Sequence, residues 1–184
     1  MVYLSGGNEL LAAEKILKNL GVKQGQTVSD LGCGGVGHFS LQAGSLVGPS
    51  GLVYAVDILR SALSNVANRA RLEGLKNIKT VWSNLEVPGA TKIPAEKVDY
   101  VLLINILFHT KDDPTIIEES IRELKHGGKV LVVDWINSAT PLGPPAEDRI
   151  TPKQVQKLAS AHNLKLVEKF SAGHYHYGLI FSKQ

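Results

Sequence analysis

Four glycines follow a short apolar run, and this stretch has the residue types best suited to holding a ligand. The run covers residues 27–31, and the glycines are Gly32, Gly34, Gly35 and Gly37. The run predicts a buried strand, and apolar residues at helical spacing after the glycines predict a helix. Glycine allows positive φ and close approach of a ligand to the backbone. A helix start adds free N–H groups and a positive dipole end. The stretch therefore predicts a cradle for a nucleotide cofactor.

Two kinds of cofactor fit this cradle. The spacing Gly32-x-Gly34-x-x-Gly37 matches the dinucleotide fingerprint, and Asp57 follows the last glycine by twenty residues, where such enzymes place a ribose-binding acid. This interpretation predicts an NAD-dependent oxidoreductase. The second interpretation starts from Asp30, two residues before the first glycine. The loop by itself does not decide between them, so the rest of the chain has to.

Strands and helices are expected to alternate along the remaining chain. We expect strands over residues 27–31, 52–58, 78–82, 98–106, 130–136, 164–170 and 177–182. We expect helices over residues 9–20, 38–48, 61–72, 114–125 and 152–162, the first capped by Ser5 or Asn8 and the last by a capping box that begins at Thr151. This alternation predicts an α/β fold with a doubly wound, mostly parallel sheet. The last two strands are too close for a crossover helix, so they must pair antiparallel.

Length and composition predict one ordinary globular domain over residues 1–184. No apolar run is long enough for a membrane span, and the N-terminal residues lack the pattern of a secretory signal, so we expect a cytoplasmic protein. The single cysteine argues against an internal disulfide and a cysteine-rich zinc site, and we expect no metal. The net charge of +3 is small and scattered, so nucleic acid is not an expected partner.

Five motifs occur in a familiar order along the chain. They are Asp30-x-Gly32-x-Gly34, Tyr54-Ala-Val-Asp57-Ile58, and residues 98–109, 124–134 and 174–181. With these motifs the chain resembles the class I S-adenosylmethionine (SAM)-dependent methyltransferases, and within them the small ubiquinone/menaquinone-biosynthesis-like (type 11) group. The resemblance implies a Rossmann-like seven-stranded sheet in a three-layer αβα fold. It also implies the strand order 3-2-1-4-5-7-6, with strand 7 antiparallel.

The resemblance implies that SAM is the cofactor and assigns residues to it. Asp57 would accept both ribose hydroxyls, and Gly32 and Gly34 would let the loop pack against the cofactor. Asp30 would lie beneath the loop. The other expected positions are Cys33 as small filler of the loop, Ile58 and Leu85 around the adenine ring, Asn84 at the adenine edge, and Asn105 with Ile106 beside the methionine part. Asn84 stands where many relatives have aspartate, and either Gly35 or Gly37 replaces the third family glycine.

The reaction implied is in-line transfer of a methyl group to an acceptor. His109 is the first candidate for a general base and His38 the second. Residues 137–149 would border the acceptor, with Arg149 available for an anionic group. We expect a small, partly apolar acceptor and a monomer or homodimer. An NAD-dependent oxidoreductase, a non-catalytic SAM-binding module and a methyltransferase acting on protein or RNA stay open as alternatives.

Overall fold

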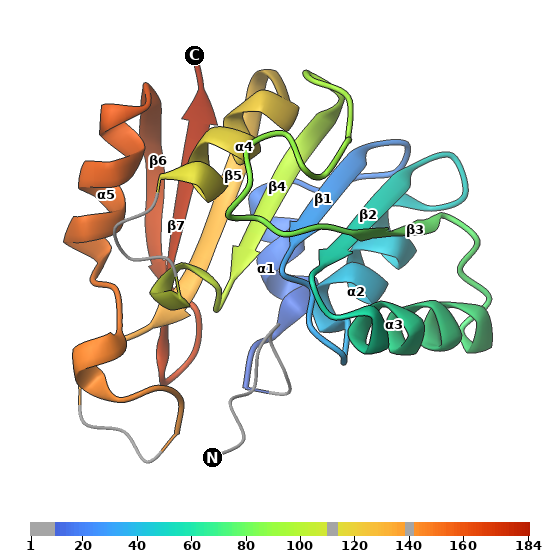
Figure 1. The fold of residues 1–184 in the computed structure, drawn as a ribbon, viewed down its shortest axis with the longest axis horizontal. Helices are drawn as coiled ribbons and strands as arrows, with labels where there is room; N and C mark the ends of the chain where they lie inside the picture. The colour runs from blue at the N-terminus through green and yellow to red at the C-terminus, as the bar shows by residue number, and fades with distance from the viewer. Residues whose placement is uncertain (1–9, 110–113, 139–141) are drawn as a thin grey trace.

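The computed structural model describes residues 10–109, 114–138 and 142–184, and these form one seven-stranded sheet (Figure 1). Its order is β3-β2-β1-β4-β5-β7-β6. The strands are β1 (Thr27–Leu31), β2 (Leu52–Asp57), β3 (Ile78–Trp82), β4 (Val98–Ile104), β5 (Leu124–Trp135), β6 (Leu164–Ser171) and β7 (His176–Lys183). Strands β1 to β5 pair in parallel, whereas β7 is antiparallel to both β5 and β6. The predicted strand order is confirmed.

Helices cover both faces of the sheet. They are α1 (Ala13–Leu20), α2 (His38–Val47), α3 (Arg60–Leu72), α4 (Thr115–Glu123) and α5 (Pro152–Ala161), with short 3₁₀ turns η1 (Leu107–His109) and η2 (Ala146–Asp148). Apolar side chains of α1 and α2 pack on one face, where Leu102, Leu131 and Val133 point, and α3 covers the same face beside β2. Helices α4 and α5 pack on the opposite face, against Leu103 and Val132. The predicted three-layer arrangement is therefore confirmed (Figure 1).

The largest differences from the predicted element boundaries concern α1, β4 and the junction of α4 with β5. Helix α1 begins at Ala13, because residues 10–12 form a turn; the proposed caps Ser5 and Asn8 lie outside the described residues. Strand β4 ends at Ile104, because Asn105 adopts a φ of 52°. Strand β5 begins at Leu124 rather than at residue 130, since the fully buried Leu124 already pairs with Val98 and so ends α4 at Glu123.

The predicted capping box at the start of α5 is present. Thr151 Oγ1 accepts a hydrogen bond from Gln154 N at 3.3 Å, and Gln154 Oε1 accepts one from Thr151 N at 2.9 Å. Pro152 occupies the first helical turn, where its missing N–H costs nothing. This box makes α5 start as the sequence predicts.

The sheet gathers the chemistry-bearing segments at one end. The glycine-rich loop follows β1, Asp57 ends β2, and η1 follows β4. Parallel strands place their carboxyl ends at one edge, and ligands of open α/β sheets bind outside that edge. In the part of the chain that the structure describes, no helix is long and apolar enough to cross a membrane.

Candidate cofactor and active site

Hydrogen bonds tie the glycine-rich loop to the end of β2. The amides of Gly32 and Cys33 both donate to Val56 O, at 2.9 and 3.0 Å. The amide of Gly34 donates to Asp57 Oδ2 at 3.0 Å. Gly32 and Gly34 have φ of 80° and 65°, conformations that other residues rarely adopt. The loop is thus held in one shape with its backbone open to a ligand.

Gly35 and Gly37 differ in backbone conformation and in surroundings. Gly37 has a φ of 61° and precedes α2, and a Cβ there would lie 2.7 Å from Val66 Cγ2 of α3. Gly35 has no positive φ, and its Cβ would meet nothing closer than Asn65 Nδ2 at 3.6 Å. In dinucleotide-binding loops the third glycine allows a helix and a strand to pack closely against each other. Gly37 likewise allows close packing here, against Val66, while Gly35 lines the cleft described next.

A cleft of about 340 Å³ opens above the loop. Most of the residues that the sequence predicted for the site line it, namely Gly32, Gly34, Asp57, Ile58, Asn84, Leu85, Ile106 and His109. Gly35, one of the four glycines of the predicted cradle, lines it too, whereas sequence reasoning missed Leu59, Ala62, Ser83, Glu86 and Ile116. Ser83 and Glu86 flank the predicted pair Asn84 and Leu85, so their place next to predicted residues was a usable signal. Ile116 comes from α4, and no local pattern points from it to this cleft.

Asp57 is a buried carboxylate in the wall of the cleft. Its Oδ1 accepts a hydrogen bond from Leu59 N at 2.8 Å, while Oδ2 accepts the one from Gly34 N. A carboxylate oxygen can accept two hydrogen bonds, so each oxygen keeps capacity for one more. The backbone thus fixes the carboxylate and leaves it able to accept a pair of neighbouring hydroxyls.

Three predicted cofactor positions lie outside the residues that line the cleft. Asp30 is buried and accepts a 2.6 Å hydrogen bond from Ser40 Oγ; burial, aided by the charge of Asp57, raises its pKa to about 7. Cys33 packs in an apolar cluster with α3, and burial raises the pKa of its thiol. Both residues support the loop from beneath. Asn105 is buried too, and its Oδ1 has no hydrogen-bond partner among the described residues.

The structure places the two candidate general bases, His109 and His38, in different surroundings. His109 ends η1, lines the cleft and stacks on Phe108 with ring centroids 3.9 Å apart; partial burial lowers its pKa. His38 Nε2 lies 2.9 Å from Leu11 O. A carbonyl only accepts, so His38 Nε2 carries the proton and donates to it. The structure therefore brings His109 to the cofactor cleft and gives His38 a structural contact outside the lining residues.

Arg149 has a structural role rather than the anion-binding role expected from the sequence. Its guanidinium is buried and donates to four backbone carbonyls, those of Ile136, Ser138, Leu142 and Pro144, at 2.7 to 2.9 Å. These bonds hold together the segment after β5. The buried His176 nearby stacks on Trp135, with ring centroids 4.1 Å apart, and burial with the charge of Arg149 lowers its pKa to about 4.

The sheet order with its antiparallel β7, the glycine-rich loop and the acid at the end of β2 define a class I methyltransferase fold. This order differs from the six-stranded dinucleotide order 3-2-1-4-5-6 and so disfavours the oxidoreductase interpretation. The model of the methyltransferase domain family matches residues 22–175. The chain belongs to this family.

Solved structures agree with this assignment over nearly the whole chain. A SAM dependent methyltransferase from Aquifex aeolicus has a TM-score of 0.85 and 25% identity, covering 94% of this chain and 90% of its own. A putative type 11 methyltransferase from Sulfolobus solfataricus has a TM-score of 0.76 and 28% identity, covering 96% and 94%.

Curated relatives match part of their length. A demethylmenaquinone methyltransferase from Lactococcus lactis is 31% identical over 130 residues, which are 70% of this chain and 49% of that protein. A ubiquinone/menaquinone biosynthesis C-methyltransferase, UbiE, from Hahella chejuensis is 33% identical over 129 residues, 70% of this chain and 50% of that protein. This chain spans about half the length of the curated relatives it matches.

Proposed function

We propose that this protein is a SAM-dependent methyltransferase that acts on a small-molecule acceptor. The observation that carries the proposal is the Asp57 carboxylate, fixed by the amides of Gly34 and Leu59 beside a glycine-rich loop at the end of β2. A nucleoside presents two adjacent ribose hydroxyls, and the two oxygens of Asp57 can each accept one. We also propose that the chain acts as one domain, since one sheet contains every strand of the described residues.

The cleft suits SAM in its size and in its lining. Its volume of about 340 Å³ lies in the range of small-ligand sites. A Cβ on Gly32 would lie 2.8 Å from Ile106 Cδ1, so the loop and the segment after β4 pack closely against each other in the lining of the cleft. Ile58 and Leu85 offer apolar surface for a base, and the Asn84 amide can bond its edge.

When bound, SAM supplies a methyl group attached to a positively charged sulfur. The protein then has to hold the acceptor in line and keep water out. Ile106 and Ile116 supply apolar surface beside His109 in the same cleft. Because partial burial lowers its pKa, the His109 imidazole stays neutral at physiological pH and can take a proton from an acceptor hydroxyl or thiol.

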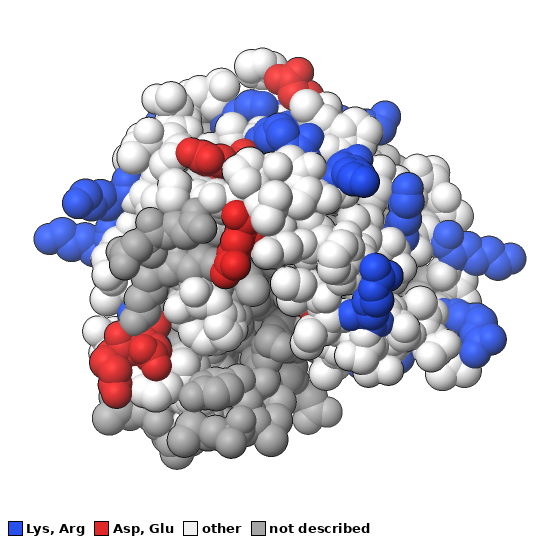
Figure 2. Space-filling view, viewed as in Figure 1, with Lys and Arg blue, Asp and Glu red and all other residues white. Residues whose placement is uncertain are grey.

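Two observations support a small, partly apolar acceptor. The curated relatives that share about half of their length with this chain are named as quinone methyltransferases. On the face drawn in Figure 2, Lys and Arg side chains lie mainly toward the upper and right-hand edges, and no basic patch of the kind that a nucleic-acid site requires covers the middle of this face. These features favour a small molecule over RNA.

The test is methyl transfer from radiolabelled SAM to three acceptor pools: small phenols, quinols and thiols; a mixed protein extract; and total RNA. We expect label in the small-molecule pool and a loss of this signal in Asp57→Ala. Label confined to protein or RNA would overturn the proposed acceptor class, while SAM binding without transfer to any pool would indicate a non-catalytic module.

A further inference from the structure

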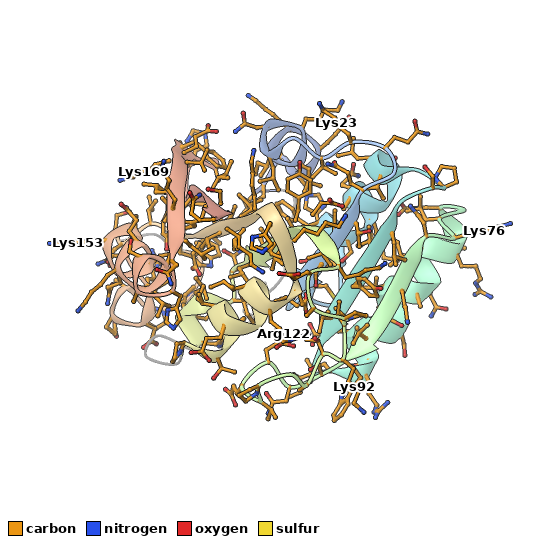
Figure 3. The ribbon with its side chains drawn as sticks, turned by 90° about the horizontal axis from the view of Figure 1, so that it is seen from above. Lys23, Lys76, Lys92, Arg122, Lys153 and Lys169 are labelled. Atoms are coloured by element: carbon orange, nitrogen blue, oxygen red, sulfur yellow. The ribbon has the colours of Figure 1, made fainter. Side chains whose placement is uncertain are left out.

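A largely buried cluster of polar and charged side chains joins α4 to the segment after β3. It consists of Thr91 from this segment and Glu119, Arg122 and Glu123 from α4. The three side chains other than Arg122 are at most 3% exposed. Figure 3 shows Arg122 on α4 close to the segment that carries Lys92. The proposed methyltransferase chemistry does not use these residues.

Glu119 is fully engaged as a charged acceptor. Its Oε2 accepts hydrogen bonds from Gly89 N at 3.1 Å and Arg122 Nε at 2.8 Å. Its Oε1 accepts one from an Arg122 terminal nitrogen at 2.8 Å and lies 2.6 Å from Thr91 Oγ1. Four contacts fill the acceptor capacity of a carboxylate. Despite burial, these bonds lower the pKa of Glu119 to about 2.

A count of protons at Thr91 identifies Glu123 as a neutral acid. Thr91 Oγ1 lies 2.6 Å from Glu119 Oε1 and also 2.8 Å from Glu123 Oε1. A hydroxyl has one proton, so it can donate to one of these oxygens but not to both. The other carboxyl must therefore be protonated, because otherwise its oxygen would contact the Thr91 oxygen with no proton between them. Glu119 is paired with Arg122, so the proton belongs to Glu123, whose Oε2 is buried without a hydrogen-bond partner among the described residues.

The cluster fastens residues 89–93, which follow directly after the part of the cleft lining formed by residues 83–86, here called the adenine wall. Besides the bond from Gly89 to Glu119, an Arg122 terminal nitrogen donates to Ile93 O at 2.6 Å. The lining residues Ser83, Asn84, Leu85 and Glu86 directly precede this segment, and Val87 N donates to Asn84 O at 3.2 Å. Contacts at residues 89–93 therefore restrict how far residues 83–86 can move away from the cleft.

We propose that Glu123, in its neutral form, is a positioning residue for the cofactor: with Thr91, Glu119 and Arg122 it holds the adenine wall closed, and its ionisation releases this wall. The proposal rests on the proposed binding of SAM. Ionisation would remove the proton shared with Thr91 and place a second negative charge beside Glu119. SAM affinity should therefore fall as pH rises.

The surroundings of Glu123 set the pH range of this effect. The charges near it are those of Glu119 and of Arg122, whose terminal nitrogen lies 3.8 Å from Glu123 Oε1; Ser29 of β1 and Thr91 contribute hydroxyls. Burial dominates and raises the pKa of Glu123 to about 7. The proton is thus present below neutral pH and lost above it.

The experiment compares the wild type with Glu123→Gln, Thr91→Val and the control Glu118→Gln, which changes an exposed glutamate of the same helix. SAM dissociation constants are measured by calorimetry at pH about 6 and about 8.5, on either side of the expected ionisation. Hydrogen–deuterium exchange of residues 84–93 is measured without cofactor at both values. Glu123→Gln keeps a hydrogen-bond donor toward Thr91 but cannot ionise. It therefore distinguishes the effect of ionisation from the effect of lost packing.

We expect SAM binding by the wild type and by Glu118→Gln to weaken about fivefold or more at the higher pH, with faster exchange of residues 84–93. Glu123→Gln should bind like the wild type at pH about 6 and show a clearly smaller pH dependence, the remainder coming from Asp30, whose pKa also lies at about 7. Thr91→Val should bind more weakly and exchange faster at both values, with a raised KM for SAM and an unchanged kcat. Equal pH dependence in Glu123→Gln and the wild type would overturn the proposal. If the wild type fails to bind SAM at all, the proposed function is wrong. The exchange of residues 84–93, measured without cofactor, still shows whether ionisation of Glu123 loosens this segment.

Discussion

Alanine at Gly37 should destabilise the protein, whereas alanine at Gly35 should not. Gly37 has a φ of 61°, and placing a side chain in this conformation costs about 1–2 kcal/mol. The new Cβ would also lie 2.7 Å from Val66 Cγ2, and overpacking of this kind costs about 1–3 kcal/mol. We therefore expect a loss of about 2–5 kcal/mol in the free energy of unfolding. For a chain of this size this corresponds to a Tm lower by roughly 4–20 °C.

Two other glycines separate the contributions to this loss. Gly74 has a φ of 71° and nothing within 4 Å of an added Cβ, so Gly74→Ala measures backbone strain alone, about 1–2 kcal/mol. Gly35 has neither positive φ nor a close neighbour, so Gly35→Ala should change stability by less than about 0.5 kcal/mol. The assay is urea unfolding of the three variants, with thermal melting as a second probe.

Each outcome bears on a separate step of the reasoning. If Gly37→Ala costs no more than Gly74→Ala, the contact with Val66 contributes nothing. If it costs no more than Gly35→Ala, the assignment of Gly37 as the closely packed glycine of the loop is wrong. Adding Val66→Ala to Gly37→Ala should relieve the steric part of the loss and leave the strain, giving a coupling free energy between the two sites.

Three further predictions concern other side chains. His109→Gln should lower kcat by about 10²–10⁴ for an acceptor that must lose a proton and leave SAM affinity unchanged, and His38→Gln should not lower kcat; steady-state kinetics decide. The low pKa of His176, about 4 against an ordinary 6.5, means that the unfolded chain binds more protons at this residue between these values, so the contribution of His176 to the free energy of unfolding should fall by about 2 kcal/mol from pH about 6.5 to about 5, opposite in sign to the contributions of the raised pKa values of Asp30 and Glu123. His176→Phe should not show this fall, and an identical pH–Tm curve would contradict the assignment. Arg149→Ala should cost about 2–4 kcal/mol, because buried carbonyls lose their donor; an unchanged Tm would contradict its structural role.

The sequence predicted the strands and the position of Asp57 close to the glycine-rich loop because these signals are local, whereas the full strand order came from the family resemblance. A strand, a glycine loop and a helix occupy one continuous stretch, and Asp57 ends the next strand, so the fold brings them together without help from distant residues. The antiparallel β7 followed from the short connection between the last two strands. These features rest on spacing, which the chain shows directly.

What the sequence could not predict depends on contacts between distant segments. The early start of β5 depends on Leu124 pairing with Val98, and no periodicity in the sequence near Leu124 predicts this pairing. Arg149 was expected to be free to bind an anion, because its partners are backbone carbonyls and no residue type in the sequence marks them. The buried cluster joins Thr91 to Glu119 and Glu123, which are 28 and 32 residues away along the chain. Charged residues in a helix predict an exposed face until the packing partner is known.

The most direct test of the account is calorimetric titration of the wild type and of Asp57→Ala with SAM and, separately, with NADH. The account predicts SAM binding by the wild type and a loss of at least about 100-fold in affinity in the variant, because hydrogen bonds to a carboxylate contribute about 1.5–3 kcal/mol each and two would be removed. Clear NADH binding with no SAM binding would contradict the account and show that the dinucleotide spacing Gly32-x-Gly34-x-x-Gly37 was the true signal.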